Sequence, residues 1–124
     1  MRRLAFLLLL AGCSPIAPAP SGSDRFANEL AGLVAGPSKQ CISANQSQGI
    51  RVVDSRTVVH EQGPVTWVNR LDSACPALSP HNTVIVEVDS GQYCRGDHVR
   101  GLETGAIIPG PVCTLRDWTP YRRR

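Results

Sequence analysis

The chain has 124 residues, 42% of them hydrophobic and 5% aromatic, and it carries 13 Lys and Arg residues against 10 Asp and Glu. This length leaves room for one domain and excludes a second one of ordinary size. Arg2 and Arg3 lie in a predicted signal, so the processed chain is close to neutral, which excludes a general nucleic-acid-binding protein.

The first residues have the pattern of a bacterial lipoprotein signal. Arg2 and Arg3 precede an uninterrupted apolar run over residues 4–11, and a glycine and Cys13 follow it. The run is too short to cross a bilayer, which takes roughly 20 helical residues. The stretch LAGC that ends at Cys13 resembles the lipobox of bacterial lipoproteins. We therefore expect residues 1–12 to be removed as a signal peptide and the thiol of Cys13 to be acylated.

A lipidated tether is expected over residues 13–23, which are rich in Pro, Ala, Ser and Gly. This composition buries no core and forms a semi-extended spacer. Acyl chains on Cys13 would anchor it, because each buried methylene contributes about 0.8 kcal/mol. Ser14 stands where many enteric-type lipoproteins carry an aspartate that retains them at the inner membrane. By that resemblance, the sequence predicts a bacterial cell-envelope protein at the outer membrane, facing the periplasm.

A short amphipathic helix and a linker are expected over residues 24–40. Apolar residues recur at helical spacing through residues 24–35. They are Phe26, Leu30, Leu33 and Val34. We expect Ser23 or Asp24 to cap the start of the helix and Gly36-Pro37 to end it.

Residues 41–121 predict a β-domain. Strands are expected at residues 50–54, 57–61, 65–71, 83–89, 99–103 and 112–115. Gln62-Gly63-Pro64 and Asp89-Ser90-Gly91-Gln92 predict hairpin turns. The fold class is therefore mainly β: a small, disulfide-stapled antiparallel sheet or barrel with one short N-terminal helix. Residues 122–124 form a basic tail, which we expect to be a solvated end; the alternative is contact with anionic phosphates of lipid head groups or lipopolysaccharide, at about 1 kcal/mol per charge.

Four cysteines remain when Cys13 is assigned to lipid. They are Cys41, Cys75, Cys94 and Cys113. An even number in an oxidising compartment predicts two disulfides. A zinc site of four thiolates is disfavoured, because the cysteines lack the close paired spacing of such sites. If the strands run up and down in sequence, Cys41 pairs with Cys94 and Cys75 with Cys113; a crossover connection would leave the other two pairings open.

The sequence contains no recognisable catalytic or metal-binding motif. An enzyme would need a pocket that gathers its histidines, which are His60, His81 and His98. We expect these to be surface residues at strand ends, and we expect no catalytic residue, metal or cofactor. Arg95-Gly96-Asp97 predicts a tight turn with Gly96 at positive φ. The aromatic residues Trp67, Tyr93, Trp118 and Tyr121 are expected to pack rather than to form a stacking surface.

Five stretches follow one another between residues 29 and 121: LAGLVAGPSKQCI, RVVDSRTVVHE, SACPAL, QYCRGD and VCTLRDWTPY. In the order and spacing of their cysteines and turns they are similar to a family of small secreted bacterial proteins with a domain of unknown function, DUF6491. Some members have Asp-Asp where Asp54-Ser55 stands here. The resemblance implies an exported β-domain without an assigned activity.

The function predicted from the sequence is that of a membrane-anchored envelope lipoprotein whose β-domain is a binding or structural module and not an enzyme. Its expected partners are the lipid bilayer, through acylated Cys13, and an envelope protein or glycan, with no nucleic acid. The alternative is an inhibitor of a hydrolase such as lysozyme. Ser90-Gly91-Gln92-Tyr93 suggests this alternative, because it is a loop that could enter an enzyme's cleft.

Overall fold

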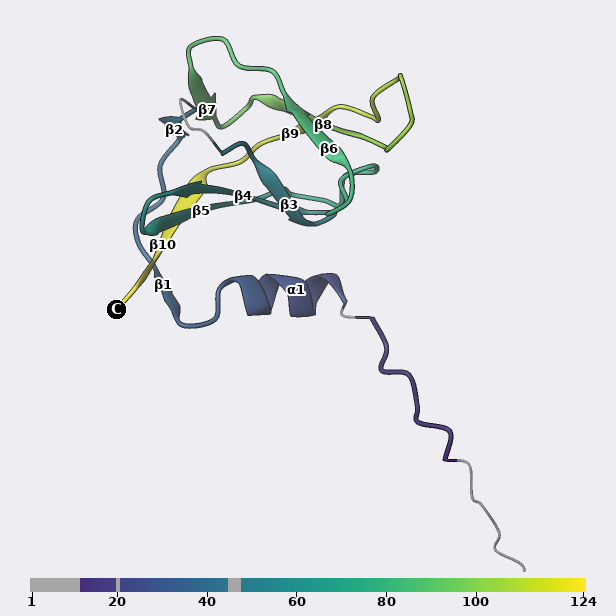
Figure 1. Ribbon diagram of the computed structural model, residues 1–124. Coiled ribbons are helices and arrows are strands. Elements are labelled where there is room, and N and C mark those ends of the chain that lie inside the picture. Colours follow the sequence, from purple (N-terminus) through teal and green to yellow (C-terminus); the bar gives the residue numbers. More distant parts are fainter. Residues whose placement is uncertain (1–11, 20, 45–47) are drawn as a thin grey trace, which may run out of the picture.

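A computed structural model describes residues 12–19, 21–44 and 48–124 (Figure 1). Its helix is α1 (Gly22–Glu29). The strands are β1 (Leu33–Ala35), β2 (Cys41–Ser43), β3 (Arg51–Asp54), β4 (Thr57–Gln62), β5 (Val65–Arg70), β6 (Thr83–Val86), β7 (Gln92–Cys94), β8 (His98–Leu102), β9 (Cys113–Thr114) and β10 (Trp118–Arg123). A mainly β fold with one short N-terminal helix is thereby confirmed, and its antiparallel sheets do not close into a barrel.

The helix α1 is capped by Ser21, and not by Ser23 or Asp24 as predicted. The Ser21 hydroxyl accepts a hydrogen bond from the Asp24 backbone N–H, and the Asp24 carboxylate accepts one from the Ser21 N–H. This reciprocal capping box satisfies two backbone donors that the first turn would otherwise leave without partners. The helix therefore begins before the position expected from the apolar spacing.

The helix also ends earlier than residue 35, where the sequence placed its end. After Glu29 the chain turns, and Gly32 adopts a left-handed φ of 75°, which a residue with a side chain rarely takes. Leu33 and Val34 then lie in β1, where they pair with Arg123 and Arg122 of β10. The spacing of Leu33 and Val34 fits a helix, but their backbone groups form the hydrogen bonds of a β-sheet.

The main sheet has five antiparallel strands in the order β1-β10-β5-β4-β3. On one of its faces lies α1, and on the other lie two smaller antiparallel sheets, β2-β7 and β6-β8-β9 (Figure 1). Both faces of the main sheet are therefore covered, which is why apolar residues occur on both sides of its central strands.

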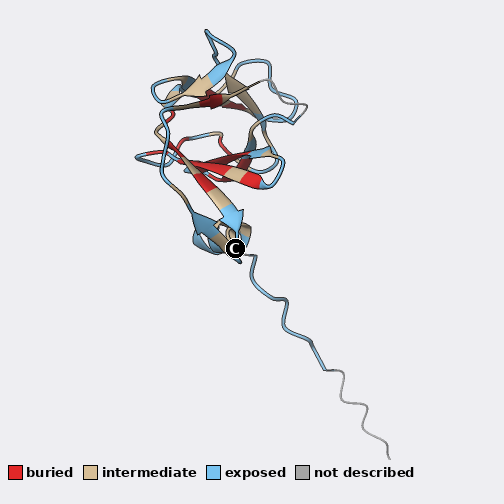
Figure 2. Ribbon diagram, turned by 90° about the vertical axis from the view of Figure 1, so that its left-hand side faces the viewer, coloured by how far each residue is buried: buried red, intermediate tan, exposed pale blue. Residues whose placement is uncertain are grey.

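Two apolar clusters result, one on each face of the main sheet, and Figure 2 shows the buried residues gathered there. The cluster between the sheets contains Ile42, Val52, Val58, Val65, Trp67, Leu71, Cys75, Leu78, Val99, Leu115 and Trp118. The cluster under the helix contains Val53, Val59 and Val68, packed against Phe26, Leu30 and Tyr121. Trp67, Tyr93, Trp118 and Tyr121 all pack against these clusters or belong to them, as expected.

The strands do not run up and down in sequence order. The turn at Gln62-Gly63-Pro64 does join the hairpin of β4 and β5. The hairpin predicted at Asp89-Ser90-Gly91-Gln92 is wrong, because β6 pairs with β8 while β7 pairs with β2. The predicted strand over residues 83–89 ends at Val86, and Val88 beyond it is exposed.

Strand β10 lies between β1 and β5, although its sequence did not predict a strand. Pro120 normally argues against a central strand, since it has no backbone N–H to donate. Pro120 nevertheless takes part in the strand contacts through its carbonyl oxygen, which accepts the Gly36 N–H at 2.7 Å. The predicted basic tail is consequently not a free end over its whole length, because Arg122 and Arg123 belong to this strand.

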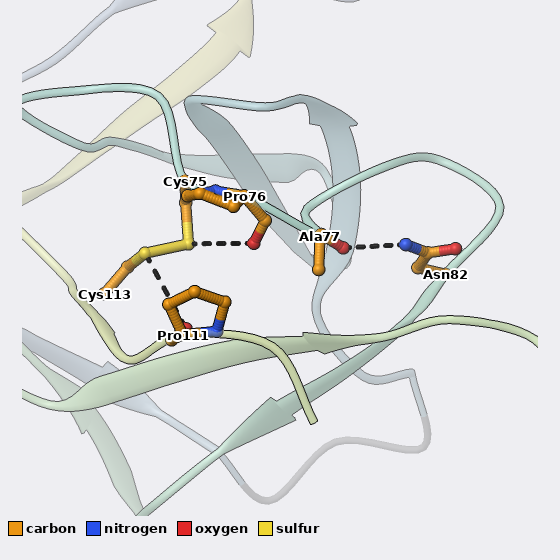
Figure 3. Close-up of a disulfide and its surroundings, with 6 residues drawn as sticks. All are labelled: Cys75, Pro76, Ala77, Asn82, Pro111 and Cys113. Atoms are coloured by element: carbon orange, nitrogen blue, oxygen red, sulfur yellow. Dashed lines mark hydrogen bonds between the residues drawn. A yellow bond between two sulfur atoms is a disulfide. The ribbon is translucent and has the colours of Figure 1, made fainter. Parts of the chain in front are cut away.

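The loop after Cys75 packs directly on β8 (Figure 3). Ala77 has a positive φ of 68°, and its carbonyl oxygen accepts a hydrogen bond from the Asn82 side chain at 2.8 Å. A Cβ added at Gly101 would overlap that carbonyl group. Gly101 is therefore the position that lets this loop lie against the strand.

Gly101→Ala should lower the free energy of unfolding by about 1–3 kcal/mol or more, because the methyl group and the Ala77 carbonyl cannot occupy the same space. Gly49→Ala is the matched control, since no atom lies within 4 Å of its added Cβ and its φ is not positive. Urea unfolding measures both variants. Equal stability of the two would contradict the close packing at Gly101.

Candidate functional site

Cys13 lies on an exposed tail that leads away from the folded domain (Figure 1). Residues 12–19 have no secondary structure and are exposed throughout. Cys13 is unpaired, and its thiol is therefore chemically available. The predicted signal lies outside the described residues except for its last position, Gly12. In the part of the chain that is described, no helix is both long and apolar enough to span a membrane.

The tail joins the domain through α1, which is fixed to the main sheet by charged and aromatic contacts. Arg51 on β3 forms ion pairs with Glu29 on the helix and with Glu61 on β4. The guanidinium of Arg70 lies 4.0 Å from the centre of the Phe26 ring. Together with the apolar cluster under the helix, these contacts attach α1, and with it the end of the tail, to the main sheet.

Both expected disulfides are present, Cys41–Cys94 and Cys75–Cys113. The pairs are those that the sequence favoured, but the strand arrangement that brings the cysteines together differs from the predicted one. Cys41 and Cys94 lie directly opposite each other in the β2-β7 pair, which the sequence analysis did not predict. Figure 3 shows the second bond, which ties the loop after β5 to the start of β9.

His60 is fully buried, and the expectation of a surface position for it is wrong. It lies in β4, and its side chain is on the face that packs against Tyr93, with the two ring centres 5.3 Å apart. Burial lowers the pKa of His60 below the ordinary value of 6.5, although the Gly49 carbonyl and Glu61 act in the opposite direction. Its Nε2 has no hydrogen-bond partner among the described residues.

The other two histidines are exposed and lie elsewhere. His98 Nδ1 is 3.3 Å from the Glu87 carboxylate across the β6-β8 pair, and His81 lies in the loop before β6. Among the described residues no group of three or more His, Cys, Asp or Glu side chains is placed to hold a metal ion. The structure thus does not bring the three histidines together into one site.

The turn at Arg95-Gly96-Asp97 has the expected form. Gly96 has a positive φ of 93°, and the Asp97 carboxylate accepts the Cys94 backbone N–H at 2.7 Å. The preceding loop, Ser90-Gly91-Gln92-Tyr93, does not present its tyrosine to solvent as a free loop would. Tyr93 is in β7 and packs against His60 and Trp118.

A basic groove of about 480 Å³ opens at one end of the main sheet. One wall is formed by residues 34–37 from β1 onward, and the other by Trp67 and Pro120. Its rim carries Lys39 and the residues 122–124, all three of which are arginines. The sequence did not predict this groove, because residues 34 and 35 were expected in a helix and the arginines in a solvated tail.

No protein-family model matches the chain, and comparison with curated proteins and with solved structures found no match. The similarity to the DUF6491 family, inferred from cysteine and turn spacing, therefore stays a prediction.

Lowering the pH should destabilise the fold through His60. Because its pKa is lowered in the folded state, the unfolded chain takes up a proton more readily as the pH falls through the unfolded value of about 6.5. Stability is therefore complete above that pH and decreases below it, by at most about 1.4 kcal/mol per pH unit for one proton. Urea midpoints measured from about pH 8 to about pH 5 should show this slope.

The slope should be reduced in His60→Gln and retained in His98→Gln, whose side chain is exposed in the folded protein. Comparing slopes, and not absolute stabilities, separates the protonation effect from any loss of packing at residue 60. An unchanged slope in His60→Gln would contradict this account.

Cys13→Ser should leave no reactive thiol in the unreduced protein, even after denaturation, because the other four cysteines are paired. Reduction should then lower the melting temperature sharply. Loss of a native disulfide costs about 2–5 kcal/mol, out of a total stability of about 5–15 kcal/mol. Thiol labelling followed by mass spectrometry checks the first statement, and two or more labelled thiols would overturn it.

Proposed function

We propose that this protein is a membrane-anchored lipoprotein of the bacterial cell envelope, and that its β-domain is a binding or structural module and not an enzyme. The observation that carries the proposal is the state of Cys13. It is the single unpaired cysteine of the five, it is exposed, and it lies on a tail that makes no element of the fold.

The chemistry of acylation explains this arrangement. A thiol that receives a diacylglycerol must be free and must lie away from the folded core, whereas a thiol needed for stability is paired. Residues 14–19, which are exposed and form no helix or strand, give the domain a spacer from the bilayer. More than one acyl chain is needed for stable attachment, since a single chain holds a protein only weakly and reversibly.

The proposed location is the outer membrane, with the domain in the periplasm. The absence of an aspartate at Ser14 supports this location, and the two disulfides fit an oxidising compartment. An envelope protein or glycan is the proposed partner of the domain. The loop that suggested a hydrolase inhibitor ends in Tyr93, whose ring contacts His60 and Trp118, so it does not offer a free tyrosine to an enzyme's cleft.

Cells that express the protein should incorporate radioactive palmitate into it, and Cys13→Ser should abolish the label. A high-salt wash should also release the variant, but not the lipidated protein, from the membrane fraction, because salt weakens attachment by charge alone and the described residues include no membrane-spanning helix. Fractionation and fluorography measure both changes.

Ser14→Ala is the control for this experiment, since it changes the neighbouring residue and keeps the thiol. It should retain both label and attachment. An unlabelled but exported wild-type protein, or firm membrane attachment of Cys13→Ser, would contradict the proposal.

A further inference from the structure

The rim of the basic groove carries positive charge that the structure leaves without a neutralising carboxylate. Lys39 and Arg122–Arg124 take part in none of the ion pairs found among the described residues. None of the residues that line the groove is an Asp or Glu. In a domain whose charges nearly balance, this concentration of cations makes the groove a favourable place for an anion.

Two carboxylates close to the end of β10 already form ion pairs with another residue. Glu29 and Glu61 line a neighbouring groove that also reaches Arg122 and Arg123. Both carboxylates form ion pairs with Arg51, which lies between them. They are not within ion-pair distance of Arg122 or Arg123, and neither Lys39 nor Arg124 lines that neighbouring groove.

The groove combines these charges with apolar walls. Trp67 and Pro120 form one wall, and the Lys39 ammonium lies 5.7 Å from the centre of the Trp67 ring. Side chains alternate along a strand, so Arg122 shares the side of β10 on which Pro120 lies. A ligand that joins an anionic group to an apolar part would match both features.

The position of the groove relative to the tail favours a membrane surface as the ligand. In both views the C-terminal end lies on the lower side of the domain, from which the tail also leaves, but in Figure 1 the two lie at opposite ends of α1 (Figures 1 and 2). From Cys13 to Ser21 the chain reaches no more than about 29 Å even when fully extended. An anchor at Cys13 would thus leave Arg122–Arg124 within reach of the bilayer surface.

We propose that the basic groove docks the domain on anionic phosphate headgroups of the membrane that holds Cys13. Each Lys or Arg near such a surface strengthens binding about fivefold. The placement of the groove near the bilayer rests on the proposed lipid anchor at Cys13, but the binding of headgroups by the groove does not. The two proposals can therefore fail separately: palmitate labelling tests the anchor, and vesicle binding without lipid tests the groove.

The test uses residues 13–124 with Cys13→Ser, a chain that contains every element of the fold and carries no lipid. It should co-sediment with phosphatidylcholine vesicles that contain phosphatidylglycerol and not with pure phosphatidylcholine vesicles. Added salt should weaken the binding. Arg122→Gln with Arg124→Gln should weaken it about 25-fold, and Lys39→Gln about fivefold. Thermal melts establish that each variant is folded.

The matched control is Arg95→Gln with Arg100→Gln, which removes the same charge from the layer of β7 and β8, far from the tail (Figure 1). It should bind vesicles nearly as well as the parent. Equal losses in the two double variants would overturn the proposal, because net charge alone would then explain the binding.

Two other results would also overturn the proposal. One is binding of glycerol phosphate without binding of vesicles, which would indicate a site for a soluble anion. The other is loss of vesicle binding in Ile107→Ser with Ile108→Ser while the arginine variant still binds. Those two isoleucines are exposed on the loop before β9, and the membrane contact would then lie on that loop.

Discussion

The main sheet depends on the backbone pairing of β10 with its two neighbours, β1 and β5. Trp118 at the start of the strand is fully buried and exchanges both of its backbone hydrogen bonds with Lys39, at 2.8 Å each. Just before it, the buried side chain of Asn69 holds the backbone N–H and carbonyl of Arg116. The strand then supplies Trp118 to one apolar cluster and Tyr121 to the other. Without β10, β1 would lose its pairing with the main sheet, and the cluster under α1 would lose Tyr121.

The disulfides lie where the hydrogen-bonded structure is smallest. The β2-β7 sheet has only two strands, and a two-stranded ribbon is marginal alone in water. Cys41–Cys94 joins these two strands covalently, and Cys75–Cys113 joins the short β9 to a loop. The larger main sheet contains no disulfide in the structure described, because its own strand pairing and two apolar clusters hold it together. Covalent and non-covalent stabilisation are thus divided between the layers.

Local patterns were sufficient to predict β3, β4, β5 and β8, since alternation is a property of neighbouring residues. Strands of three residues, such as β1, β2 and β7, contain too little alternation to be recognised. Pro120 concealed β10. A sheet covered on both faces also buries residues on both sides, so the burial of His60 could not be predicted from alternation. The basic groove depends on the crossover of β10, which no local pattern reveals.

Strand β10 lies inside the main sheet but comes late in the sequence, and this affects when the protein can fold. β10 follows every other strand of the described chain, yet it pairs with β1 near the other end of the domain, where Leu33 meets Arg123. Such distant contacts form slowly, because a long loop must close before they are made. A chain of this kind stays without a complete main sheet until its last strand is available. If the chain becomes available from its N-terminus onward, its topology delays completion of the main sheet until residues 118–123 have emerged.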